Sequence, residues 1–292
     1  MTTTPTASEN AVRDACSQLG LSARDITVIR SHATPVFLLP GADAVARVKP
    51  LAEEADSARG IALLRWLTDQ GFPAVEPLDV PQPVQCGPYV VTLWVRYSQH
   101  RTGAPPPSAL GTLLSQLHEL PVPPVELPPY QPLASLHDAV TSSSTLSPDD
   151  RRWLESAVEE SRSDYRALRS PLGQGFVHGD AYPGNTLWDG DTVRLADWDE
   201  AAFGPRELDL ANTFQGARFG RTRQEIEEFV RHYGHDPSHW PGLRTLITMR
   251  DLHTLASFIR RADGGDPSAT AQLSHRLTTL RTGRAQARWD VY

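Results

Sequence analysis

The chain has 292 residues, of which 39% are hydrophobic and 22% are charged, a balance that is ordinary for a globular protein with a large core. A net charge of −7 disfavours a nucleic-acid partner, and Cys16 and Cys86 are too few for a disulfide framework. The first ten residues lack the basic and apolar regions of a secretion signal, and no apolar run is long enough to span a membrane. Composition therefore predicts a cytoplasmic protein without a membrane partner.

The first hundred residues have the pattern of a small sheet with helices. Short runs rich in β-branched and aromatic residues are bounded by turn residues, and the apolar residues of one longer segment recur with helical spacing. The expected elements are helices at 11–20 and 52–70 and strands at 26–30, 35–39, 44–48, 75–79 and 88–95.

From residue 108 onward the pattern is mainly helical. Ser147 is a predicted N-cap followed by proline, and Thr222 with Glu225 forms a predicted capping box. The expected helices are 108–120, 147–168, one beginning at 222, 238–262 and 267–288. We therefore predict an α+β fold with two lobes, namely an N-lobe at 1–97, a linker at 98–107 and a helical C-lobe at 108–292.

The segment around residues 176–199 contains the candidate catalytic and metal-binding residues. A predicted strand leads into His-Gly-Asp, which ends at Asp180, and Asn185 follows after four intervening residues. A second predicted strand leads into Asp197, and this order and spacing are those of a kinase catalytic loop followed by a metal-binding aspartate. Phosphoryl transfer needs one carboxylate to orient the attacking hydroxyl, and an amide and a second carboxylate to hold Mg²⁺ on the phosphates. Asp180 is thus the predicted catalytic residue, and Asn185 and Asp197 are the predicted metal ligands.

Other interpretations of these residues remain open. His178, Asp180, Asp197 and Asp199 are also plausible ligands for the metal of a hydrolase, although that function gives Asn185 no role. His178 is predicted to brace the loop by hydrogen bonds. Asp209 is predicted to accept backbone N–H groups of the loop, and Asp199 either lies near the metal or caps the following turn.

With His-Gly-Asp, Asn185 and Asp197 in this order, the segment 176–188, together with 193–211, resembles the aminoglycoside phosphotransferase family. The members of that family are small-molecule kinases. The resemblance implies a bilobal, protein-kinase-like fold with a small β-sheet N-lobe and a mainly helical C-lobe. It also implies ATP and Mg²⁺ as cofactors, with ATP in the cleft, and a small-molecule hydroxyl acceptor.

The predicted third strand should present a cation to the phosphates. Alternation places Arg47 and Lys49 on one face, and the family's pattern puts Arg47 where the phosphate-binding lysine stands. Lys49 is the alternative, and we expect it to be a solvated strand end at the rim of the cleft because Pro50 follows it. The family's helix carboxylate corresponds to Gly60, so Asp56 or Glu53 is the expected substitute, unless the ion pair is absent.

Two further nucleotide contacts are inferred from position. The turn after the first strand has no glycine, so Ser31 and Thr34 are candidates to meet phosphate oxygens, with an ordinary hairpin turn equally expected. The strand ending near residue 95 resembles the hinge that holds adenine, which gives Leu93 and Val95 backbone contacts. Trp94 is expected to be a core residue.

The predicted function is an ATP- and Mg²⁺-dependent phosphotransferase acting on a hydroxyl of an antibiotic or hydroxylated metabolite. Residues 218–292 contain 12 Arg against 8 acidic residues, which disfavours a polycationic aminoglycoside as acceptor. Two alternatives are a pseudokinase-like nucleotide-binding module without turnover and a metal-dependent hydrolase. The oligomeric state cannot be predicted from the sequence.

Overall fold

The computed structural model describes residues 6–31, 34–98, 103–284 and 287–290. The chain forms two compact units, each built from separate stretches of the sequence. The first consists of Met1–Pro105, Leu120–Glu126 and Gly184–Asp199, and the second of Pro106–Glu119, Leu127–Pro183 and Glu200–Tyr292.

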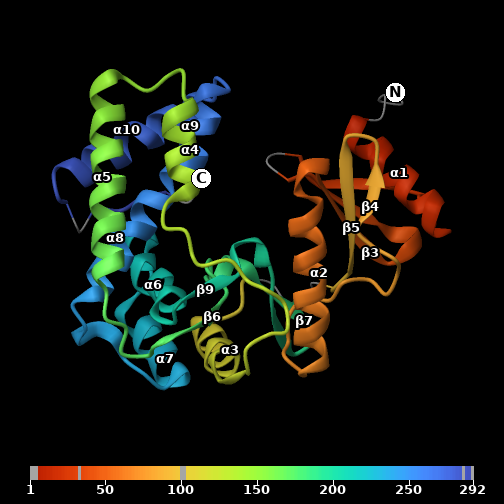
Figure 1. Ribbon diagram of the computed structural model, residues 1–292, viewed down its shortest axis with the longest axis horizontal. Coiled ribbons are helices and arrows are strands. Elements are labelled where there is room, and N and C mark those ends of the chain that lie inside the picture. Colours follow the sequence, from red (N-terminus) through yellow and green to blue (C-terminus); the bar gives the residue numbers. More distant parts are fainter. Residues whose placement is uncertain (1–5, 32–33, 99–102, 285–286, 291–292) are drawn as a thin grey trace. The chain divides into compact units, whose positions relative to one another are not determined.

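The first unit is built on a five-stranded antiparallel sheet with the strand order β1-β2-β3-β5-β4 (Figure 1). A separate two-stranded hairpin, β7-β8, belongs to the same unit. Its elements are α1 (Ala7–Leu19), β1 (Thr27–Arg30), β2 (Val36–Leu39), β3 (Ala44–Pro50), α2 (Glu54–Asp69), β4 (Val84–Cys86), β5 (Tyr89–Val95), β7 (Thr186–Asp189) and β8 (Thr192–Leu195).

Strand alternation divides β3 between a core and a pocket. Ala44, Ala46 and Val48 are buried against α1, whereas the residues between them point to the other face of the sheet. Cys16 of α1 is fully buried in this core. The two faces of β3 thus have the polarity that the sequence pattern predicts.

The predicted strand at 75–79 is wrong. The strands that pair with β5 are β3 and β4, and residues 75–79 run alongside β5 with only an isolated bridge between Pro77 and Trp94. Proline has no N–H to donate, so Pro73 and Pro77 prevent a continuous ladder in this segment.

The second unit is mainly helical, with one short strand pair, β6-β9. Its core combines apolar residues of α4, α5, α8, α9 and α10 with Val177 and Ala202 of the strands. The elements are α3 (Pro107–Glu119), α4 (Ala134–Ser142), α5 (Pro148–Ala167), β6 (Gln174–Val177), β9 (Ala202–Pro205), α6 (Glu207–Gln215), α7 (Arg223–Tyr233), α8 (Gly242–His253), α9 (Leu255–Asp263) and α10 (Pro267–Arg281).

Helix caps in this unit follow the sequence signals. The side chain of Ser147 accepts a hydrogen bond from the backbone amide of Asp150, and Thr222 and Glu225 form the complete capping box. The predicted helix 238–262 is instead two helices, α8 and α9, which meet at Thr254. Helix α4 was not predicted from the sequence.

None of the helices in the described ranges is long and apolar enough to cross a membrane.

Candidate functional site

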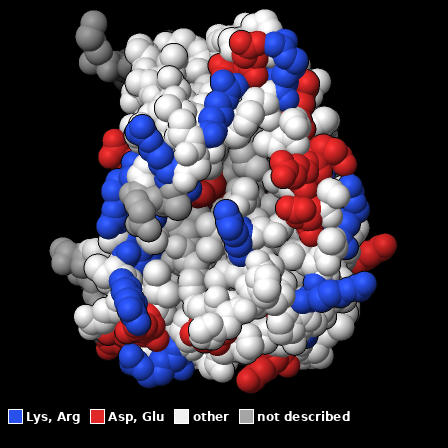
Figure 2. Space-filling view, turned by 90° about the vertical axis from the view of Figure 1, so that its left-hand side faces the viewer, with Lys and Arg blue, Asp and Glu red and all other residues white. Residues whose placement is uncertain are grey.

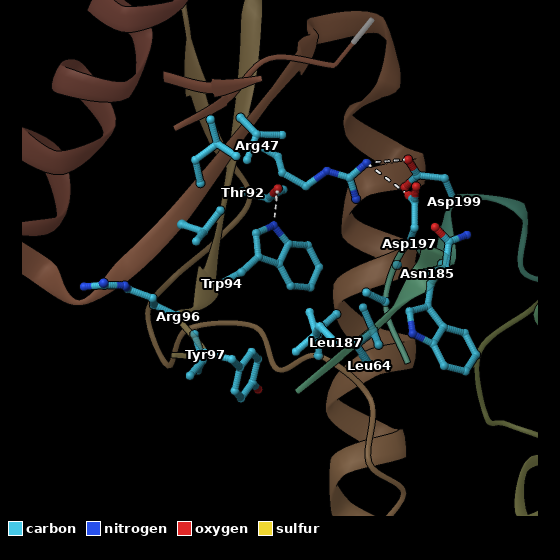
Figure 3. Close-up of a pocket in the computed structure, with 18 of the residues that line it drawn as sticks. Arg47, Leu64, Thr92, Trp94, Arg96, Tyr97, Asn185, Leu187, Asp197 and Asp199 are labelled. Carbon is cyan, nitrogen blue, oxygen red and sulfur yellow. Dashed lines mark hydrogen bonds and ion pairs between the residues drawn. The ribbon is translucent and has the colours of Figure 1, made fainter. Parts of the chain in front are cut away.

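A pocket of about 740 Å³ lies in the first unit, and its volume is typical of small-molecule sites. β3, β5, α2 and the β7-β8 hairpin all contribute to its wall (Figure 3). Of the predicted site residues, the structure places five on this wall, namely Arg47, Lys49, Val95, Asn185 and Asp197.

Two carboxylates at the end of the hairpin bind the cations of β3. Arg47 Nη2 lies 2.7 Å from Asp199 Oδ2 and 3.4 Å from Asp197 Oδ1, and both contacts are visible in Figure 3. Lys49 Nζ lies 3.1 Å from Asp199 Oδ1. Burial opposes the charge of Asp199, but Arg47 and Lys49 hold the pKa of its carboxyl below the ordinary value.

The expectation that Lys49 is a solvated strand end is wrong. Its side chain is 13% exposed, lines the pocket and binds Asp199 as Arg47 does. The strand continues through Pro50, so Lys49 is held within the sheet and not at its rim. Glu53 lies 3.6 Å from Lys49 Nζ, and Asp56 pairs with Arg59, so neither is the observed partner of Arg47.

Asn185 and Asp197 flank the open end of the β7-β8 hairpin, one beside each strand. Asn185 directly precedes β7, and Asp197 follows β8 by two residues. The amide of Ala196 donates to the carbonyl of Asn185 at 2.8 Å, which closes the two ends on each other. Asp197 has a φ of 63°, in the left-handed region, which turns the chain there.

The donors present at this position fit a magnesium ion. Mg²⁺ takes oxygen ligands and is typically bound by one or two carboxylates together with substrate phosphates. Asn185 and Asp197 supply an amide oxygen and a carboxylate on the pocket wall. Within the described ranges, no group of three or more His, Cys, Asp and Glu residues forms a metal site of its own. An amide oxygen and one carboxylate are only part of the shell of a magnesium ion, and phosphate oxygens of a substrate can complete it.

The predicted hinge residues differ in what their backbone groups already bind. The N–H of Leu93 donates to Gln82 Oε1 at 2.7 Å, and its carbonyl accepts from Gln82 Nε2 and from the amide of Leu78. Val95 lines the pocket, and its amide donates to the carbonyl of Glu76 at 2.9 Å. The sequence did not indicate that the side chain of Gln82 forms hydrogen bonds with the backbone of β5 at Leu93.

Trp94 lies on the pocket wall and is not a core residue. Its indole N–H donates to Thr92 Oγ1 at 3.0 Å, and Figure 3 shows the ring extending into the pocket toward Leu187. An indole face in this position offers a stacking surface for a planar ring.

The other two predicted phosphate contacts are not on the pocket wall. Ser31 is exposed and Thr34 is partly buried, and the pocket is lined instead by Ile29 and Arg30 of β1. The turn residues between Ser31 and Thr34 lie outside the described residues.

The predicted catalytic loop, which lies in the second unit, is held by Asp209. The backbone N–H groups of His178 and Gly179 donate to its two carboxylate oxygens, each at 2.8 Å. His118 Nε2 lies 3.1 Å from the same carboxylate, and His118 Nδ1 lies 2.8 Å from the hydroxyl of Tyr233. The prediction that Asp209 accepts backbone groups of this loop is therefore confirmed.

His178 braces the loop from within. Its Nδ1 accepts the amide of Asp180 at 3.2 Å, and its side chain is fully buried, as predicted. Gly179 has a φ of 84°, and a Cβ there would overlap with the carbonyl oxygen of Glu200. No side chain fits at position 179, which explains why the arginine of the kinase pattern is a glycine here.

Asp180 is ion-paired with Arg250, a residue of α8 that the sequence did not single out. The Arg250 guanidinium also donates to the carbonyl of Gly179 at 3.3 Å, and Asn212 Nδ2 donates to Asp180 Oδ1 at 3.3 Å. Burial opposes ionisation of Asp180, but Arg250 and the smaller contributions of His253, His178 and Asn212 lower its pKa. An arginine among the apolar residues of a helix is a weak sequence signal, which is why Arg250 was missed.

Glu200 and His253 lie beside this ion pair. Glu200 Oε2 is 3.9 Å from Arg250 Nη1, and His253 Nε2 is 3.5 Å from Glu200 Oε1. Burial, reinforced by the neighbouring Arg250, lowers the pKa of His253 to about 4, so its ring is neutral at pH 7.

The fold is that of the protein-kinase-like phosphotransferases, as predicted. Over 98% of this chain and 96% of the other, it superimposes on amicoumacin kinase in complex with AMP-PNP, Ca²⁺ and Ami, with a TM-score of 0.76 and 12% identity. Spectinomycin phosphotransferase in complex with ADP and spectinomycin matches with a TM-score of 0.66 and 17% identity over 96% of this chain and 95% of that one. The choline kinase of Streptococcus pneumoniae matches with a TM-score of 0.65 and 14% identity over 94% of this chain and all of that one.

The sequence model of the phosphotransferase enzyme family matches residues 25–246, and the chain belongs to this family. It is accordingly a small-molecule kinase with a hydroxyl group as acceptor, which confirms the predicted enzyme class. No curated protein matches the chain.

Proposed function

We propose that the protein transfers the γ-phosphoryl group of ATP, bound with Mg²⁺, to a hydroxyl group of an antibiotic or a hydroxylated metabolite. The observation that supports this most is the set of charges on the pocket wall, where two cations of β3 lie with Asp197 and Asp199 next to Asn185. Cations for phosphate oxygens and oxygen ligands for a divalent metal are the groups that phosphoryl transfer requires.

In this proposal Asn185 and Asp197 hold the metal on the phosphates, and Arg47 and Lys49 contact the α- and β-phosphates. When bound, Mg²⁺ neutralises the charge that develops on the phosphoryl oxygens. Similar structures contain AMP-PNP with Ca²⁺, or ADP, which supports a nucleotide and a divalent metal as the cofactors.

Asp180 is the proposed catalytic residue, which orients the acceptor hydroxyl and accepts its proton. Its lowered pKa keeps the carboxylate ionised at neutral pH, and its bond from Asn212 limits the directions in which it can turn. Arg250 fixes the same carboxylate from the protein interior.

The adenine is proposed to bind against Trp94 and to contact the backbone at Val95. Val95 lines the pocket, and its amide donates to Glu76. Leu93 is disfavoured for this role because it does not line the pocket and both of its backbone groups are hydrogen-bonded to Gln82. Ser31 and Thr34 stay proposed phosphate contacts on their sequence position alone, since neither lines the pocket.

The charges around Asp180 favour an acceptor with few positive charges. Arg250 offsets one of the two carboxylates there, and His253 is neutral at pH 7, so Asp180 and Glu200 do not form a strongly negative surface. Figure 2 shows both basic and acidic side chains on one face of the molecule, so that face is not covered by a single sign of charge. The solved neighbours include kinases of amicoumacin, spectinomycin and choline, and we propose an acceptor of comparable size.

A coupled assay of ADP release tests the proposal. The protein is incubated with Mg²⁺ and ATP and with a panel of antibiotics, sugars and amino alcohols, and each active acceptor is analysed by mass spectrometry for one added phosphate. Asp180→Asn is the matched control, with equal size and no carboxylate. Nucleotide binding without acceptor-dependent ADP release would instead indicate a pseudokinase, and a hydrolysed product formed without ATP would indicate a hydrolase.

A further inference from the structure

Asp199 divides its two carboxylate oxygens between two cations. Oδ2 accepts from Arg47 at 2.7 Å, and Oδ1 accepts from Lys49 at 3.1 Å. Arg47 and Lys49 are two residues apart on one face of β3, where their like charges repel each other without a carboxylate between them. Asp199 therefore fixes both cations at once, and we call these three residues the β3 clamp.

Helix α2 does not supply this carboxylate. The residues that it presents to the pocket are Asp56, Ser57, Gly60 and Leu64. Asp56 pairs with Arg59, and Gly60 has no side chain. The remaining contact is the longer one from Glu53 at the start of the helix to Lys49.

We propose that Asp199 is a positioning residue that holds Arg47 and Lys49 ready for the triphosphate, in the place of a carboxylate on α2. This inference rests on the proposed nucleotide-binding function. Long cationic side chains lose much rotamer freedom when they bind a ligand, and a partner that fixes them beforehand reduces that loss. Asp199 acts on nucleotide affinity through these cations, independently of the metal that Asn185 and Asp197 hold.

Isothermal titration calorimetry of Asp199→Asn tests the inference, with ATP measured both with Mg²⁺ and in EDTA. The substitution keeps the shape of the side chain and removes its charge. We expect the dissociation constant to rise about tenfold under both conditions, as for the loss of charge-assisted hydrogen bonds. Asp69→Asn is the matched control, since it makes the same change at an exposed residue at the end of α2, away from the pocket wall and the clamp, and it should bind like the wild type.

A rescue variant separates a lost carboxylate from a disturbed fold. A Cβ at Gly60 has nothing within 4 Å, so a longer side chain has open space toward the pocket. Adding Gly60→Glu to Asp199→Asn should recover most of the lost affinity, whereas adding Gly60→Gln should not. Melting temperatures of all variants should remain close to that of the wild type because the Asp199 side chain is 42% exposed.

The outcomes are distinguishable. A wild-type chain that binds no nucleotide overturns the proposed function together with this inference. A wild-type chain that binds, with Asp199→Asn unchanged or weakened only when Mg²⁺ is present, overturns the inference alone, because Asp199 then has no role or acts as a metal ligand. Failure of Gly60→Glu to restore binding also contradicts it.

Discussion

Arg250 forms an ion pair with Asp180 from inside the second unit, with its guanidinium almost fully buried. The same guanidinium donates to the carbonyl of Gly179, so one residue of α8 fixes both the backbone and the carboxylate of the catalytic loop. The carboxylate that we propose to accept the proton is thus oriented from the protein side before any acceptor binds.

Arg250→Met should therefore destabilise the fold and impair turnover. Loss of one partner of a buried ion pair costs about 3–5 kcal/mol, and the partial exposure of Asp180 places the expected loss at the lower end. Urea denaturation measures this loss. Adding Asp180→Asn should recover part of the stability, because it removes the buried negative charge that Arg250 no longer offsets, and a double variant less stable than Arg250→Met would contradict the pairing.

The same variant should change the dependence on pH. In the wild type the pKa of Asp180 is lowered, so the pair stabilises the fold above the ordinary carboxyl pKa near 4 and this contribution is lost as the pH falls through the folded-state pKa. The stability difference between wild type and Arg250→Met should accordingly be largest near pH 7 and shrink in acid. The acid limb of kcat should move to higher pH in the variant, and an unmoved limb would mean that Asp180 is not the group that titrates.

Asp180→Asn should abolish turnover while leaving nucleotide binding intact. The substitution removes a proton acceptor, which typically contributes ~10²–10⁴-fold, and changes neither the pocket wall nor the metal ligands. Steady-state ADP release with an identified acceptor, together with calorimetry of ATP binding, checks both parts. Near wild-type release would show that another residue has the catalytic role.

Asn185→Ala and Asp197→Ala should each raise the Mg²⁺ concentration needed for half-maximal activity. Two protein oxygen ligands leave the metal dependent on phosphates, so the loss of either weakens the complex with nucleotide. The increase in melting temperature that ATP causes should become smaller in both variants when Mg²⁺ is present, and should be unchanged in EDTA. A magnesium dependence equal to that of the wild type would contradict the assignment.

Arg47→Ala and Lys49→Ala should raise the KM for ATP by similar factors. The sequence alone predicted a small effect for Lys49, but the structure places both cations on the pocket wall, each bonded to Asp199. Initial rates over a range of ATP concentrations give the KM for ATP of each variant. A defect confined to Arg47→Ala would mean that Lys49 serves only to hold Asp199.

Gly179→Ala should be far more damaging than Gly190→Ala. Both glycines have positive φ, which costs any other residue about 1–2 kcal/mol. Only at Gly179 would the new Cβ overlap with a backbone carbonyl, that of Glu200, whereas Gly190 has nothing within 4 Å. Thermal denaturation of the two variants isolates the cost of the overlap, and equal losses would show that the loop simply moves aside.

Local signals in the sequence determined most of the secondary structure and the identity of the motif. The spacing from Asp180 to Asn185 and the strand before Asp197 are visible without coordinates because catalytic loops keep their chemistry within a few consecutive residues. Alternation likewise placed Arg47 and Lys49 on one face, and helix caps depend on residues three positions apart.

Only the tertiary structure decided which charges meet. The partner of Arg47 is 152 residues away at Asp199, and that of Asp180 is 70 residues away at Arg250. The side chain of Gln82 accepts a hydrogen bond from the backbone amide of Leu93, a contact that no local pattern indicates. Ion pairs and side-chain hydrogen bonds are short-ranged and follow from how distant segments pack, whereas periodicity and capping act along the chain. For this reason the sequence identified the chemistry of the site, and the fold decided which residues hold it in place.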